Sequence, residues 1–163
     1  MTLASMILSE GPLKRQRPTT PLVAMAILSA APGIPALAAA DPEQGGRPLS
    51  ATLSGAAEVP PGDEDGSGTA AVTVNLGQRE LCYDLAVAGI DPATAAHVHE
   101  GVEGEVGPPV VTLGVPDAGG AASGCLNLSK ELLQRLLQDP SGFYINVHSA
   151  EFPQGAVRGQ LAK

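Results

Sequence analysis

Apolar and polar residues alternate with a period of two in one short segment after another of this 163-residue chain. In an extended strand this alternation puts every second side chain on the same face of a sheet, so one face can be buried. Segment 80–87 carries Leu81, Tyr83, Leu85 and Val87 at alternate positions. Strands of this kind are predicted at 49–53, 69–76, 80–87, 95–99, 110–113, 122–128, 143–149 and 156–161.

The composition favours strands over helices. Twenty glycines and fifteen prolines would disrupt helices, because glycine costs backbone entropy and proline removes a hydrogen-bond donor. One segment breaks the pattern, since Ser129 can cap a helix with Leu132, Leu133, Leu136 and Leu137 on one stripe. We predict an all-β fold: an antiparallel Greek-key β-sandwich or flattened barrel with about eight strands and one short helix.

The N-terminal segment has the pattern of a secretory leader. Basic residues precede an apolar run at 22–31, and Ala36-Leu37-Ala38 fits a cleavage site. The run is shorter than a membrane span requires, so we expect no stable span after cleavage. An uncleaved amphiphilic anchor is the alternative, and the long stretch before Lys14 leaves the start codon open. We therefore predict a secreted or periplasmic protein.

The chain is expected to divide into a signal peptide at 1–38, a linker at 39–48 and one β domain at 49–163. The formal net charge is −8, and it is −10 without residues 1–38, which hold three basic residues and one acidic residue. An acidic surface repels phosphate groups, so we expect no nucleic-acid partner. The sequence does not specify an oligomeric state.

Two cysteines, Cys82 and Cys125, follow the predicted leader. In an oxidising compartment an even pair favours a disulfide over two free thiols, and neither cysteine lies in a CxxC metal-binding pattern. A bridge would close a loop of about 43 residues and stabilise the fold by roughly 3–4 kcal/mol in the chain-entropy treatment. We predict a disulfide.

The three histidines of the chain all lie in predicted strands. His97 and His99 are two residues apart, so their side chains project from one face and can converge on one ion. His148 lies on the polar face of another predicted strand, together with Tyr144 and Asn146. Three imidazoles with one open position are typical of catalytic zinc and copper sites, and copper leads on intrinsic affinity, with zinc as the alternative. Surface or core histidines satisfied by hydrogen bonds are the structural alternative.

Glu100, Glu103 and Glu105 follow the histidine pair in a glycine-rich segment. Their carboxylates could accept the second ring N–H of each imidazole and so orient the ligands. A solvated turn is the more common role of such an acidic run.

Several motifs together resemble the CHRD (chordin-type) domain family. They lie in the expected order over residues 49–162, at 53–61, 96–101, 144–149, 152–155 and 157–161, where they read LSGAAEVPP, AHVHEG, YINVHS, FPQG and VRGQL. The resemblance implies an all-β domain of the kind found in chordin and in bacterial exported proteins. It does not by itself imply a reaction.

A second resemblance concerns one strand. His97-Val-His-Glu100 is similar to the copper-binding strand of copper/zinc superoxide dismutases, in which a later histidine completes the copper shell and an arginine guides the anion. His148 and Arg158 are the positions that could match them, which makes Arg158 the candidate catalytic residue. A structural ion pair is an equally good role for Arg158. The chain has no fourth histidine, so no zinc subsite is expected.

These observations lead to two hypotheses and a third option. The first is an exported copper-binding protein with a three-histidine centre, which acts on a small anion such as superoxide as a copper-only superoxide dismutase or has a related redox role. The second is a non-catalytic extracellular binding or matrix module whose metal is structural or missing. Metal storage or delivery is the third, although histidine-only ligation fits it less well.

Overall fold

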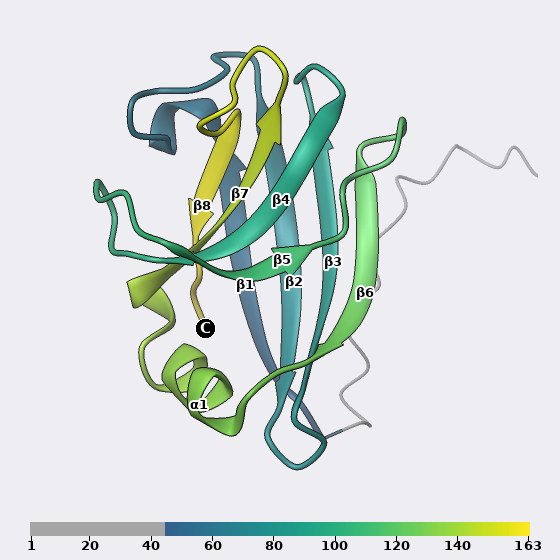
Figure 1. Ribbon diagram of the computed structural model, residues 1–163, viewed down its shortest axis with the longest axis vertical. Coiled ribbons are helices and arrows are strands. Elements are labelled where there is room, and N and C mark those ends of the chain that lie inside the picture. Colours follow the sequence, from purple (N-terminus) through teal and green to yellow (C-terminus); the bar gives the residue numbers. More distant parts are fainter. Residues whose placement is uncertain (1–44) are drawn as a thin grey trace, which may run out of the picture. The chain divides into compact units, whose positions relative to one another are not determined.

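The computed structural model describes residues 45–163, so the predicted leader and most of the predicted linker lie outside the described residues. Eight strands and one α-helix make up the described part (Figure 1). The strands are β1 (Arg47–Ser54), β2 (Ser67–Asn75), β3 (Glu80–Ala88), β4 (Ala93–Glu100), β5 (Pro109–Leu113), β6 (Ala121–Asn127), β7 (Phe143–Ser149) and β8 (Val157–Gln160). The helix α1 spans Lys130–Gln138, and short 3₁₀ turns lie at Gly55–Ala57 and Pro140–Gly142.

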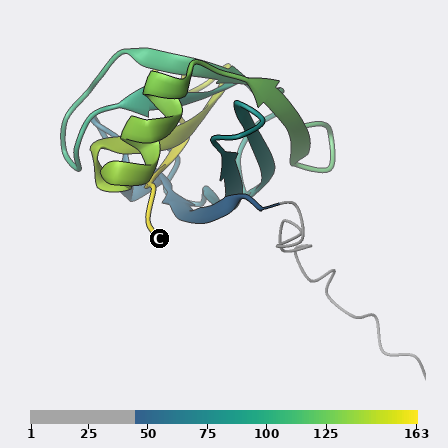
Figure 2. The ribbon, with the colours of Figure 1, turned by 90° about the horizontal axis from the view of Figure 1, so that it is seen from below.

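All eight strands belong to one antiparallel sheet with the order β5-β4-β7-β8-β1-β2-β3-β6. The sheet curls round on itself into a flattened, nearly closed barrel (Figures 1 and 2). Several strands that are neighbours in the sheet are distant in sequence: β4 lies beside β7, and β3 lies beside β6. Such crossovers are the Greek-key feature that the sequence pattern predicted, and the predicted fold class is confirmed.

Aliphatic side chains fill the inside of the barrel. Every strand except the edge strand β6 contributes buried hydrophobic side chains, as the period-two pattern requires, and the core includes Leu53, Val72, Val74, Leu81, Leu85, Val98, Ile145, Val147 and Val157. Strands β7 and β8 differ from the others because almost all of their residues are buried, on both faces. Their outward face must therefore be covered by another part of the chain.

The helix α1 forms where the leucine stripe predicted it. The Ser129 hydroxyl accepts a hydrogen bond from the Leu132 N–H at 3.2 Å, which satisfies one of the free donors at the helix start. Leu133, Leu136 and Leu137 are buried, whereas Leu132 is only partly buried. Figure 2 shows the helix at the end of the barrel seen from below.

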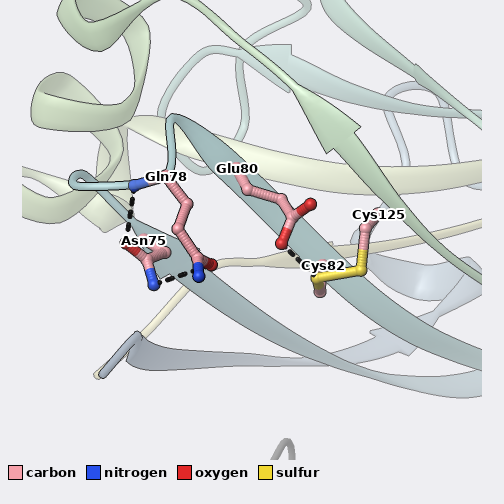
Figure 3. The surroundings of a disulfide bond; sticks show 5 residues. All are labelled: Asn75, Gln78, Glu80, Cys82 and Cys125. Carbon is pink, nitrogen blue, oxygen red and sulfur yellow. Dashed lines mark hydrogen bonds between the residues drawn. A yellow bond between two sulfur atoms is a disulfide. The ribbon is translucent and has the colours of Figure 1, made fainter. Parts of the chain in front are cut away.

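The predicted disulfide is confirmed. Cys82 on β3 and Cys125 on β6 lie directly opposite each other in the antiparallel pair, and their sulfur atoms are 2.05 Å apart (Figure 3). The Glu80 carboxylate lies 3.4 Å from the Cys82 sulfur. Because β6 is an edge strand with one paired neighbour, the disulfide adds a covalent link at one edge of the sheet.

Reducing the disulfide is expected to lower the melting temperature substantially. The bridge closes a loop of 43 residues, which corresponds to roughly 3–4 kcal/mol of chain entropy in the unfolded state. For a domain of this size that free energy equals a shift of about 10–15 °C. Thermal unfolding followed by circular dichroism, with and without a dithiol reductant, measures the shift. The double variant Cys82→Ser/Cys125→Ser should show the same loss and no response to reductant. Equal melting temperatures would contradict the expectation.

Candidate metal centre

The pairing of β4 with β7 brings the three histidines together. In this register His97 lies opposite Asn146, His99 opposite Tyr144, and His148 opposite Ala95. Val98, between the two β4 histidines, is 0% exposed and points into the barrel. The histidines therefore share the outward face of two adjacent strands.

The ring nitrogens lie close enough to surround one ion. Each histidine offers one nitrogen to a group whose members are all within 4.8 Å of one another. His97 Nδ1 and His148 Nε2 are 3.1 Å apart. Two nitrogens bound to one ion at about 2.0–2.1 Å, at angles between square and tetrahedral, would stand about 3 Å apart. The observed spacing matches this value without any movement.

Backbone carbonyls hold the other ring nitrogens. His99 Nδ1 lies 2.8 Å from the Gly107 carbonyl oxygen, and His148 Nδ1 lies 3.1 Å from that of Pro153. A carbonyl oxygen can only accept, so each Nδ1 carries the proton and each Nε2 keeps its lone pair. His99 Nε2 is buried and has no hydrogen-bond partner among the residues that the structure describes. Buried polar atoms are rarely left unpaired, so this nitrogen indicates a missing partner.

The surroundings keep two of the imidazoles neutral. Partial burial lowers the pKa of His97, and the nearby His148 and His99 rings lower it further. Burial also lowers the pKa of His148, against the opposing effect of its bond to the Pro153 carbonyl. A neutral imidazole is the form that binds a metal ion. Both shifts favour the ligating form of His97 and His148.

The acidic segment after β4 does not supply the carboxylates that could have oriented the imidazoles. Glu100 pairs with Arg135 of α1, and Glu103 and Glu105 are exposed. The solvated-turn interpretation is therefore correct for the side chains. The orienting groups are the carbonyls of Gly107 and Pro153, which sequence reasoning missed because a backbone carbonyl leaves no sequence signature.

Arg158 lies beneath the segment 101–108, which we call the covering loop. The side chain is 2% exposed, and its guanidinium donates to the carbonyl oxygens of Glu105 at 2.7 Å and Val102 at 2.9 Å. It also lies over the Tyr144 ring, 3.4 Å from the ring centroid. Its proposed role as an anion guide stays a prediction.

Two further polar residues belong to the same region. Tyr144 stacks on His99, with ring centroids 4.8 Å apart and planes 14° apart. Glu58 is 6% exposed, and its charge and that of Arg158 interact. Any side chain at Gly155 would collide with the Glu58 carboxyl group. The sequence predicts neither the stacking of Tyr144 nor the burial of Glu58. It places Tyr144 on the histidine face without a ring contact, and Glu58 only within a motif.

The fold and the histidine cluster together define a small all-β domain that carries candidate metal ligands on adjacent strands. The CHRD domain model matches residues 49–161, and the chain belongs to this family. A comparison with curated proteins finds no match. Among residues 45–163, no helix combines the length and apolarity needed to cross a membrane.

We expect stability to fall with rising pH because of Glu58. Burial raises the pKa of its carboxyl group from 4.5 to about 7, although Arg158 opposes the shift. The folded state therefore holds a proton that the unfolded state releases, so the contribution of Glu58 decreases between pH 4.5 and about 7. Relative to Glu58→Gln, the wild-type protein should lose about 2 kcal/mol over this range.

Urea unfolding of both proteins at several pH values measures this difference. Contributions from other titrating groups cancel when wild type and variant are compared. Glu103→Gln, which changes an exposed acid, is the matched control and should follow the wild type. If the free energy of unfolding changed with pH in the same way for the wild type and for Glu58→Gln, the ionisation of Glu58 would not destabilise the folded protein.

Proposed function

We propose that this CHRD domain is an extracytoplasmic module that binds one transition-metal ion through His97, His99 and His148. The observation that carries the proposal is the buried His99 Nε2, which lacks a partner among the described residues. The centroid of the His99 ring lies 5.5 Å from that of His97 and 6.3 Å from that of His148. The neutral state of His97 and His148 supports it further. The disulfide is consistent with an oxidising compartment outside the cytoplasm.

Copper is the ion that this ligand set favours. Imidazole nitrogens suit both copper and zinc, and divalent copper binds such sites more tightly than zinc in the general affinity order. His97 and His148 are only partly buried, so one side of the centre is open to solvent. An open position allows an exchangeable water or a small anion to reach the ion.

The finer proposal is superoxide dismutation. Copper held by His97, His99 and His148 would supply one-electron redox chemistry, by which two superoxide ions and two protons would give dioxygen and hydrogen peroxide. The chain's own contribution is to hold three neutral imidazoles around the ion and to leave its outer side accessible. The negative net charge of the protein disfavours the approach of an anion, so a local positive field would be needed for a high rate.

A non-catalytic binding module is the second candidate, and one observation favours it. Arg158, the residue expected to guide the anion, is 2% exposed and is engaged with two carbonyl oxygens. A centre without a guiding cation suits metal binding better than rapid turnover of superoxide. Both candidates share the same ligands and differ in activity.

Copper binding is tested by titrating the metal-free protein with copper(II). We expect a single stoichiometric step and an electron paramagnetic resonance spectrum with coupling to imidazole nitrogens. His99→Ala should weaken binding by more than the roughly 10–100-fold typical of losing a residue that only orients a ligand, because it removes a ligand itself. The control Glu103→Gln should bind normally. If the wild-type protein shows neither the step nor the spectrum, the metal proposal fails.

Dismutase activity is tested on the copper-loaded protein by following superoxide decay in a stopped-flow instrument. If the protein is a dismutase, superoxide should decay rapidly with the copper-loaded wild type. With the His97→Ala variant superoxide should decay slowly, even at saturating copper. If the protein is a non-catalytic module, superoxide should decay equally slowly with the wild type and with His97→Ala, although only the wild type holds copper tightly. Catalase added to the assay reports hydrogen peroxide as the product. This comparison separates the two candidates.

A further inference from the structure

Three side chains form a stack across three neighbouring strands. Strand β7 lies between β4 and β8, and its Tyr144 ring contacts His99 on the β4 side and Arg158 on the β8 side. The His99 and Tyr144 rings are nearly parallel, with centroids 4.8 Å apart. The Arg158 guanidinium carbon lies 3.4 Å from the Tyr144 centroid. A flat cation over an aromatic face is attracted by the electron density of the ring.

The same arginine fastens the covering loop. Its two terminal nitrogens donate to the carbonyl oxygens of Val102 and Glu105, and the neighbouring Gln160 amide donates to that of Gly101 at 2.7 Å. Gly107, at the end of this loop, supplies the carbonyl that accepts the His99 Nδ1 proton. The stack therefore sets the plane of the His99 ring, and the loop sets which of its nitrogens carries the proton.

We propose that Arg158 and Tyr144 are positioning residues that hold His99 in the orientation and tautomer needed for Nε2 to bind the metal. The metal-binding part rests on the function proposed above, whereas the control of the His99 tautomer does not. Arg158 acts through Tyr144 and through the Gly107 carbonyl. It is not in contact with the ion or with a substrate.

The buried guanidinium has its own support. An unpaired charge in the interior is costly, so a buried arginine needs hydrogen-bond acceptors around it. The carbonyl oxygens of Val102 and Glu105 are those acceptors for the Arg158 guanidinium. Glu58 is a nearby acid whose charge interacts with that of Arg158, and Gly155 leaves the space that its carboxyl group occupies. A charge intended to attract an anion would gain nothing from this burial. The arrangement suits a residue that organises backbone and ring.

The first test uses the metal-free protein and nuclear magnetic resonance of the imidazole nitrogens. In the wild type, His99 should be a single neutral tautomer with the proton on Nδ1. Arg158→Lys keeps the charge but loses the planar fork, and Tyr144→Leu removes the stack, so both should shift His99 toward a mixture of tautomers. Arg135→Lys is the matched control, because Arg135 lies over Phe143 of the same strand, 5.5 Å from the ring centroid. It should leave His99 unchanged.

The second test adds copper(II) to the folded variants. Arg158→Lys and Tyr144→Leu should bind copper about tenfold or more weakly than the wild type, with altered paramagnetic resonance parameters. The proposal would be overturned if a folded Arg158→Lys protein kept the His99 tautomer, the copper affinity and the paramagnetic resonance spectrum of the wild type. If the variant lost only the salt-dependent reaction with superoxide, Arg158 would be an anion guide instead.

The proposal can still be decided if the variants do not fold, or if the protein does not bind copper. If neither variant folds, the wild-type spectrum still decides, because a proton on His99 Nε2 overturns the proposal directly. If the wild type binds no copper but the variants shift the tautomer, the proposed function fails and the positioning of His99 stands.

Discussion

The register between β4 and β7 is the constraint on which the centre depends. It aligns two histidines of one strand with the face that carries His148 on the next, so that His97 Nδ1 and His148 Nε2 come within 3.1 Å. A shift of one residue would turn every side chain of β7 over and send His148 into the barrel. The apolar side chains opposite, such as Ile145 and Val147, prevent that shift because they would then face water. Core packing and ligand geometry are therefore specified by the same alternation.

A second layer over this sheet converts a surface cluster into a defined site. The covering loop is held by Arg158 and Gln160 of β8 and contacts the Tyr144 hydroxyl of β7, and both Tyr144 and Arg158 are buried. Polar groups buried in this way are tolerated when they are hydrogen-bonded, and the loop carbonyls accept from the two β8 side chains. These hydrogen bonds offset part of the cost of burying them. A surface histidine pair without this cover would keep more freedom and bind an ion less selectively.

Much of the fold could be predicted from the sequence, and less of the site. Alternation in segments such as 80–87 sets strand identity because burial on one face is a local property of the pattern. The His-x-His pair was visible for the same reason. The partner strand of β4 was not visible, because pairing across 51 residues leaves no local trace. The contacts of Arg158 and the place of Glu58 also escaped prediction, since they depend on a loop folding back and on carbonyls that every residue possesses.

The positions of the imidazole rings fit the proposed metal site. His97 Nδ1 and His148 Nε2 are 3.1 Å apart, which is both a hydrogen-bond distance and the spacing expected of two nitrogens that share one ion. The carbonyls of Gly107 and Pro153 hold the His99 and His148 rings. Little side-chain entropy would then be lost on binding, because the rings are ordered beforehand. In the proposed metal centre, the buried side of the cluster would supply rigidity, and the solvent-exposed side would leave a position for exchange.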